Sequence, residues 1–262
     1  MCFDVDSQPP VQPLFGSDAQ GADITLTSAD GTTFAAYAAR ADSSTANGAG
    51  IVILPDVRGL YQFYKDLAMR FAEAGVAAVA IDYFARTAGL TARDDDFEFM
   101  PHVQQTKWEN IAADAASAVA YLRAQTGANG QAPSSIFTVG FCFGGSVSFN
   151  QAAQKLGLAG VIGFYGRPVT HPLMSGSPAP IDMVGHYECP VLGLFGGADQ
   201  GIPVEQVHQF DEALTKANVP HEIVIYPGAP HSFFDRKQAE FAKESADAWD
   251  RMLAFIKANT KA

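Results

Sequence analysis

Short apolar runs alternate with longer stretches of helical character along most of this chain, and this alternation limits the fold more than any other feature. Residues 51–54 read Ile-Val-Ile-Leu, a continuous run that suits a strand buried on both faces. Strands separated by helices predict a mostly parallel sheet with helices packed on both sides. The predicted strands are 51–54, 76–81, 136–139, 160–164, 191–195 and 222–226; the predicted helices are 61–74, 107–125, one ending at 156, 204–217 and 237–257; and a loop is predicted at 126–130.

The N-terminal part of the chain departs from this alternation. Residues 24–28 and 33–38 flank Ala-Asp-Gly and predict an antiparallel hairpin, which makes the α/β sheet mixed. Residues 1–22, with three prolines, predict an extended arm in front of a single domain at 23–262. Within that domain, the stretch 167–188 is long and has no clear periodicity. We expect it to be either a substrate lid or wall, or a passive surface loop.

The overall charge and the cysteines limit the partners and the cofactors. The formal net charge is −11, so nucleic acid and anionic membranes would be repelled, and a small molecule is the expected ligand. Cys2, Cys142 and Cys189 are far apart and have no metal-ligand spacing, which predicts a protein without metal or cofactor in a reducing cytoplasm. The sequence has no secretory pattern and no apolar stretch long enough to cross a bilayer. A monomer and a homodimer fit equally well.

A glycine-rich segment directly after the predicted strand 136–139 carries the first sign of chemistry. Residues 140–145 read Gly-Phe-Cys-Phe-Gly-Gly, the pattern of a nucleophile elbow with sulfur in place of a hydroxyl. Such a turn lifts Cys142 off the sheet edge, and the N-terminus of the next helix favours a thiolate. The alternative is a structural cysteine packed in the core, where free cysteine is common.

Polar residues that follow other predicted strands supply partners for Cys142. In open α/β sheets, ligands bind outside the carboxyl ends of the strands. Asp199 follows the strand 191–195, and His231 follows the strand 222–226 after a short Pro/Gly loop. The order Cys142, Asp199, His231 is the order of nucleophile, acid and histidine in α/β-hydrolases. We therefore predict a catalytic triad.

The residue types indicate the reaction that such a triad performs. His231 would accept the Cys142 proton, and Asp199 would hold His231 in the correct tautomer. The thiolate would attack an ester-like carbonyl, and the backbone N–H groups of Phe143 and Val57 would donate to the oxyanion. Water activated by His231 would then hydrolyse the thioacyl intermediate.

These segments together make the chain resemble the dienelactone hydrolase family, the branch of α/β-hydrolases with a cysteine nucleophile. The resemblance implies an α/β-hydrolase fold, the triad Cys142, Asp199 and His231, and carboxylic ester hydrolysis of the carboxymethylenebutenolidase type without a cofactor. It also implies a carboxylate that contacts the resting thiol; Asp56 stands there instead of the usual glutamate, and could instead pair with Arg58. The similarity covers roughly residues 24–256 and is strongest at 51–86, 138–145, 161–166, 195–199 and 228–233.

The substrate is where the resemblance weakens. Family members that bind a carboxylated lactone hold its carboxylate with arginines, one of them four residues past the histidine. Asp235 stands at that position, with Arg236 beside it, and the acidic segment 94–102 contains no arginine. We therefore expect an altered, more apolar or neutral substrate. The residues predicted around the pocket are Arg58, Arg86, Phe141, Tyr165, Ser232, Phe233, Phe234 and Arg236.

Two alternatives to this hydrolase remain open. Enzymes of the DJ-1 and glutamine amidotransferase type also place a cysteine on an elbow, with a histidine close downstream. Here 89 residues separate Cys142 from His231, and the Asp199 loop lies between them, which favours the hydrolase. The other alternative is a binding or sensing protein on a hydrolase scaffold, because a fold alone does not establish activity.

Overall fold

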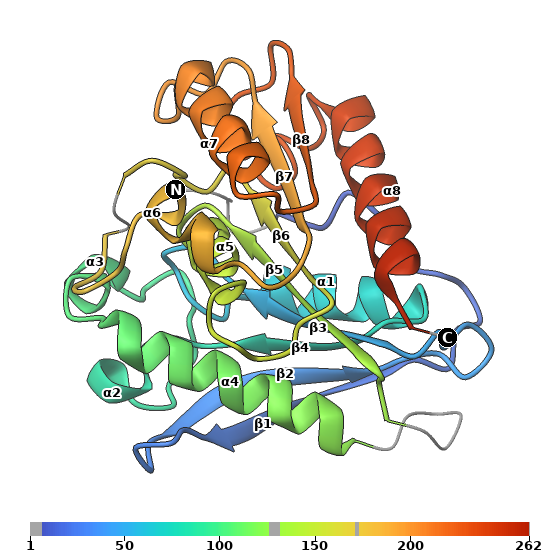
Figure 1. Ribbon diagram of the computed structural model, residues 1–262. Coiled ribbons are helices and arrows are strands. Elements are labelled where there is room, and N and C mark those ends of the chain that lie inside the picture. Colours follow the sequence, from blue (N-terminus) through green and yellow to red (C-terminus); the bar gives the residue numbers. More distant parts are fainter. Residues whose placement is uncertain (1–6, 126–131, 171–172, 262) are drawn as a thin grey trace.

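The structure is a computed structural model that describes residues 7–125, 132–170 and 173–261 (Figure 1). Within them, eight strands form one sheet in the order β1-β2-β4-β3-β5-β6-β7-β8. The β1 and β2 strands are antiparallel to their neighbours, and the remaining pairs are parallel. The strands are β1 Gln20–Thr27, β2 Thr33–Arg40, β3 Ala49–Leu54, β4 Ala77–Ile81, β5 Ser135–Phe141, β6 Gly160–Phe164, β7 Val191–Gly196 and β8 His221–Tyr226.

Helices cover both faces of this sheet. In Figure 1, α4 lies in front of the sheet and α1 lies behind it. The larger helices are α1 Gln62–Glu73, α4 Trp108–Ala124, α5 Phe143–Gln151, α7 Val204–Lys216 and α8 Ala242–Asn259. The shorter ones are α2 Ala85–Ala88, α3 Phe99–Val103, α6 Pro180–Met183 and the 3-10 turn η1 Val184–His186.

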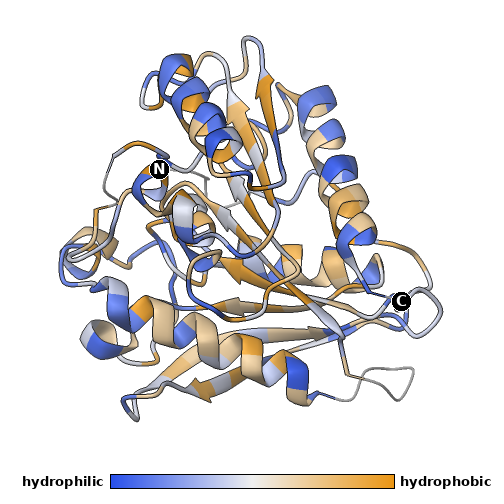
Figure 2. Cartoon of the chain, in the orientation of Figure 1, coloured by the Kyte–Doolittle hydropathy of each residue, from blue (hydrophilic) through white to orange (hydrophobic). Residues whose placement is uncertain are grey.

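The β3 strand shows why a continuous apolar run produces this layered arrangement. Successive side chains of a strand point to opposite faces. Ile51 and Ile53 pack in the core that contains α1, whereas Val52 and Leu54 pack in the core that contains α4. Figure 2 shows hydrophobic residues along the central strands and hydrophilic residues along α7 and α8. A strand buried on both faces therefore needs apolar residues at every position, and the predicted mixed, mostly parallel sheet is confirmed.

The predicted element boundaries are wrong in two places near the site. The last helix begins at Ala242 rather than at residue 237, because residues 231–241 form successive turns, in which Lys237 N–H donates to the Ser232 carbonyl at 3.0 Å. The helix after Cys142 ends at Gln151 rather than at 156. Four short elements, α2, α3, α6 and η1, were not predicted, since they are too short to show a helical period.

The described parts of the predicted arm and of the segment 167–188 are hydrogen-bonded to the rest of the domain. The arm gives way to β1 at Gln20, and before that Ser17 Oγ donates to Asp42 Oδ2 at 2.6 Å. The segment 167–188 is joined to α4 and α5, because Trp108 N–H donates to the Ser175 carbonyl and Asn150 Nδ2 donates to the Pro178 carbonyl. Its role as a lid stays a prediction. The predicted loop 126–130 and Cys2 lie outside the described residues.

Candidate active site

The nucleophile elbow is formed by the turn from β5 into α5. Cys142 lies between them with φ 55° and ψ −113°, a backbone conformation that residues other than glycine rarely adopt. A Cβ at Gly144 would overlap the Leu54 carbonyl, and one at Gly145 would lie 2.6 Å from the Phe164 carbonyl oxygen. The glycines are therefore required by the close approach of α5 to β3 and β6.

Asp199 and His231 come together beside Cys142 from the loops after β7 and β8. His231 Nδ1 lies 2.6 Å from Asp199 Oδ2, and Gly201 N–H donates to the other oxygen, Asp199 Oδ1, at 2.8 Å. His231 is also hydrogen-bonded to Cys142. Burial opposes protonation of the imidazole, but the bonds and charges of Asp199 and Cys142 outweigh it and raise the pKa of His231 to about 10. The imidazolium form of His231 is therefore favoured beside the Asp199 carboxylate.

These residues open into a pocket of about 560 Å³. Val57 and Phe143, whose N–H groups were predicted to bind an oxyanion, both line it. Phe143 is the first residue of α5, so its N–H is one of those that find no partner within the helix. The other predicted site residues that line the pocket are Cys142, Tyr165, Asp199, His231, Ser232 and Arg236.

Three phenylalanines predicted around the pocket belong to the core instead. Phe141, Phe233 and Phe234 are fully buried, and the Phe141 ring stacks on Phe164 and Phe234 at centroid distances of 4.8 and 5.8 Å. The prediction that they line the pocket is wrong, because proximity in sequence to a catalytic residue does not determine the side of the backbone on which a ring lies.

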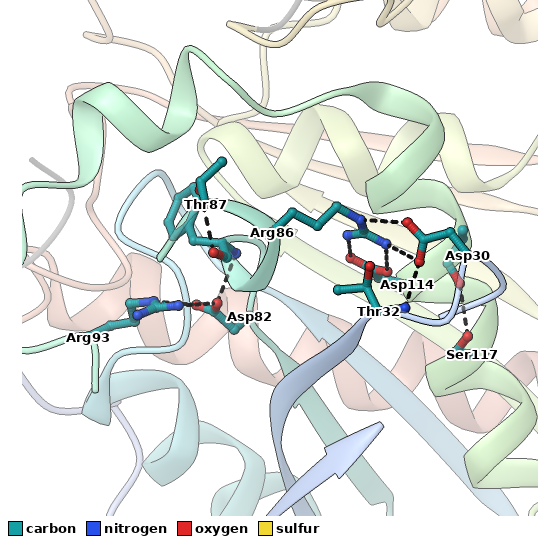
Figure 3. A network of polar contacts seen from close by, with 10 residues as sticks. Asp30, Thr32, Asp82, Arg86, Thr87, Arg93, Asp114 and Ser117 are labelled. Atoms are coloured by element: carbon teal, nitrogen blue, oxygen red, sulfur yellow. Dashed lines mark hydrogen bonds and ion pairs between the residues drawn. The ribbon is translucent and has the colours of Figure 1, made fainter. Parts of the chain in front are cut away.

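Arg86 also lies away from the pocket. Its guanidinium contacts Asp114 Oδ2 at 2.7 Å and Asp30 Oδ2 at 2.9 Å, and so connects the β1–β2 turn to α4 (Figure 3). Nearby, Arg93 pairs with Asp82 at 2.8 Å. The prediction of a substrate-binding Arg86 is wrong, since buried and half-buried carboxylates hold its side chain.

Asp56 and Arg58 lie on the loop after β3 and are not among the residues that line the pocket. Asp56 is fully buried, and its Oδ1 accepts a hydrogen bond from the Arg58 backbone N–H at 2.8 Å. The Arg58 guanidinium lies 3.6 Å from Asp95 Oδ1 and above the Tyr61 ring. Contact between Asp56 and the Cys142 thiol stays a prediction.

Two cationic residues that line the pocket were missed by the sequence reasoning. Arg167 and Lys237 line the pocket together with Arg236. Arg167 comes two residues after Tyr165, at the carboxyl end of β6, so the rule that predicted the triad could also have predicted it. The pocket therefore carries more positive charge than the sequence analysis predicted, since that analysis expected a site for an apolar or neutral substrate.

Backbone strain is concentrated at this site. Five non-glycine residues that the structure describes have a positive φ, and three of them line the pocket: Cys142 at 55°, Tyr165 at 36° and Ser232 at 63°. Such strain persists where the surrounding structure holds it, which is typical of functional sites.

Across the described ranges, no group of three or more His, Cys, Asp and Glu side chains is arranged to hold a metal ion. None of the helices there is both long and apolar enough to cross a membrane.

The sequence of this chain is similar to those of known proteins. A model of the dienelactone hydrolase family matches residues 34–260. A protein of Escherichia coli O157:H7 named "Putative carboxymethylenebutenolidase" is 28% identical over 246 residues, which cover 92% of this chain and 88% of that protein. A protein of Methylorubrum extorquens with the same name is 30% identical over 212 residues, covering 77% and 69% respectively.

Solved structures agree with this match. A structure named "Putative Dienelactone Hydrolase" from Klebsiella pneumoniae is 25% identical with a TM-score of 0.77, covering 91% of this chain and 98% of that one. A dienelactone hydrolase-like promiscuous phosphotriesterase from metagenomic libraries has a TM-score of 0.75 at 22% identity, covering 94% of this chain and all of the other (100%). The fold is that of the α/β-hydrolases.

Proposed function

Because the chain belongs to the dienelactone hydrolase family, we propose that it hydrolyses small esters or lactones with Cys142 as nucleophile, His231 as base and Asp199 as orienting acid. The observation that supports this most is the hydrogen-bonded series from Asp199 through His231 to Cys142 at the wall of one pocket. A structural cysteine would need neither partner.

The proposed reaction has two steps. With the Cys142 proton held on His231, the thiolate adds to the carbonyl carbon, so that the carbonyl oxygen becomes an oxyanion next to the Phe143 and Val57 N–H groups. Collapse breaks the ester C–O bond, and His231 returns the proton to the leaving alkoxide. A water molecule, deprotonated by His231, then adds to the thioester, and the released thiolate restores the resting site. Asp199 keeps the imidazole in one tautomer throughout.

Turnover of an activated aryl ester by variants tests this assignment. We expect Cys142→Ala to abolish measurable turnover, and Asp199→Asn to lower kcat by roughly 10³–10⁴-fold, because the imidazole loses its orienting carboxylate. Iodoacetamide should label Cys142 rather than Cys189, since burial raises the pKa of the Cys189 thiol to about 12. Cys189→Ala is the matched control and should turn over normally. Wild-type turnover by Cys142→Ala would overturn the proposal.

The cations around the pocket support an anionic substrate, which reverses the expectation from the sequence. Arg167, Arg236 and Lys237 line a pocket in a chain whose net charge is −11. Guanidinium groups bind carboxylates with charge-assisted hydrogen bonds. We propose a carboxylated ester or lactone. An ester bearing a free carboxylate should be hydrolysed faster than its methylated counterpart, and Arg167→Gln should reduce that preference through KM. Equal rates for the two substrates would contradict this assignment.

A further inference from the structure

A second buried carboxylate lies close to the proposed catalytic histidine, on the same loop. Asp235 is 1% exposed. Its Oδ2 accepts a hydrogen bond from the Tyr165 hydroxyl at 2.7 Å, and its Oδ1 accepts one from the Arg236 backbone N–H. Both of these donors are electrically neutral. The resemblance to the family led us to expect an arginine at this position. The carboxylate that stands there instead has a structural role of its own, as the acceptor of these two hydrogen bonds.

The partner of Asp235 is a residue under strain at the end of β6. Tyr165 has a positive φ of 36°, and its N–H donates to the Leu194 carbonyl at 2.8 Å. Its ring centroid lies 4.8 Å from that of His231, while the edge of the ring meets Phe233 at 5.7 Å. The Tyr165 ring is thus held by its backbone at one end and by Asp235 at the other, with the His231 imidazole against its side.

We propose, on the basis of the function proposed above, that Asp235 is a positioning residue, which holds Tyr165 against His231 and thereby sets the orientation of the imidazole toward Cys142. Asp199 holds the imidazole through Nδ1, and His231 is also hydrogen-bonded to Cys142, but hydrogen bonds at the edge of a ring still allow it to tilt. The Tyr165 ring packed against the imidazole limits this tilt. Effective proton transfer requires such a fixed geometry.

The charge of Asp235 adds a pH dependence to this arrangement. Burial raises the pKa of Asp235 to about 7, although the bonds from Tyr165 and Arg236 partly oppose that shift. The charged and titratable groups that face it are Tyr165 from the end of β6, Cys142 from the elbow, and His231 and Arg236 from its own loop. An ionised Asp235 favours the imidazolium and opposes the thiolate, so the reactivity of Cys142 should change near neutral pH.

Two substitutions separate the positioning contact from the charge. Tyr165→Phe removes the hydrogen bond and keeps the ring and the carboxylate, and it should lower kcat on the order of tenfold while KM stays within about twofold. Asp235→Asn keeps an acceptor for the Tyr165 hydroxyl and removes the charge. It should retain most of kcat at pH 6, and the wild-type inflection near pH 7 should disappear from its profile of kcat/KM. Asp247→Asn is the matched control, because Asp247 accepts a hydrogen bond from Tyr226 at 2.8 Å outside the pocket.

The rate of iodoacetamide alkylation of Cys142, followed by mass spectrometry from pH 5 to 9, gives a readout that needs no substrate. We expect Tyr165→Phe to slow alkylation several-fold at pH 7, and Asp235→Asn to lose the inflection, whereas Asp247→Asn behaves as wild type. Equal kcat and alkylation rates in Tyr165→Phe and Asp247→Asn would overturn the proposal, as would an unchanged pH profile in Asp235→Asn. If Cys142→Ala still turned over ester, the proposed function would fail, while the alkylation profile would still test Asp235. If Asp235→Asn did not fold, Tyr165→Phe alone would decide.

Discussion

Two regions at the same edge of the sheet hold buried carboxylates in different ways. After β4, Asp82 and Asp114 each contact an arginine: Arg93 pairs with Asp82, and Arg86 pairs with Asp114 (Figure 3). In the pocket, Asp235 accepts its hydrogen bonds from a tyrosine hydroxyl and a backbone amide. A guanidinium compensates a buried carboxylate and fixes the chain around it. Neutral donors leave the carboxylate free to titrate near neutral pH, which suits a reactive site.

The arginine pairs have a structural task. Arg93 also donates to the carbonyls of Gly89 and Thr91, at 2.8 and 2.7 Å, so it closes the loop that follows α2. Asp82 in turn accepts hydrogen bonds from the backbone N–H groups of Leu60 and Phe84. One ion pair therefore connects the loop that follows α2 to the loop after β3, which contains Leu60. Three experiments test this contrast with the pocket.

The largest effect is expected from the buried pair. The side chains of Arg93 and Asp82 are 2% and 1% exposed, so Arg93→Ala should lower the free energy of unfolding by about 3–5 kcal/mol, because it leaves a buried charge uncompensated. Urea denaturation measures this change. The double variant Arg93→Met with Asp82→Asn is the control and should lose much less. A loss below about 1 kcal/mol in Arg93→Ala would mean that the pair behaves as a surface ion pair.

The effect of Asp235 on stability should depend on pH, in contrast to that of a permanently paired group. The pKa of Asp235 is about 7 in the folded protein and 3.8 in its ordinary state, so the folded protein binds this proton more tightly. Its contribution to stability is therefore present below about pH 4 and is lost as the pH rises to 7. The difference in unfolding free energy between Asp235→Asn and wild type should shift in favour of the variant by roughly 2–4 kcal/mol over this interval.

Urea denaturation at pH 4.5, 6 and 8 measures that difference. Asp247→Asn is again the control, because the hydrogen bond from Arg251 lowers the pKa of Asp247, and the sign of its pH dependence is therefore opposite. A constant difference between Asp235→Asn and wild type across the three pH values would show that Asp235 stays in one charge state, as a paired carboxylate does.

The smallest effect is expected for Arg86, whose guanidinium contacts Asp114 and Asp30. Arg86→Ala should lower the free energy of unfolding by about 1–3 kcal/mol, because Asp114 is fully buried and loses its guanidinium partner. Asp30→Ala should have a smaller effect, since the Asp30 side chain is 47% exposed. Thermal unfolding of the two variants measures both. Equal losses would indicate that Arg86 stabilises the β1–β2 turn rather than the Asp114 carboxylate.

Position in the sequence relative to the strands was enough to select the three residues of the proposed triad, which the structure places together. Cys142, Asp199 and His231 each follow a strand with a recognisable apolar run, and parallel strands bring their carboxyl ends to one edge. The same reasoning could not place Phe141 or Arg86, because the direction of a side chain depends on the partners that the fold brings to it. Phe141 meets Phe164 and Phe234 in the core, and Arg86 meets Asp30 and Asp114, which are distant in sequence.

Local patterns thus specify the strands, the elbow and the order of the three reactive residues, since each depends on a few neighbouring residues and on strand order. The surroundings of those residues depend on contacts between distant segments. Only the packed structure brings Arg167 and Lys237 to the pocket wall and sets Tyr165 between Asp235 and His231. The physical reason is that burial and charge compensation act through space, so the environment that determines substrate preference and the charge of Asp235 exists only after the chain has folded.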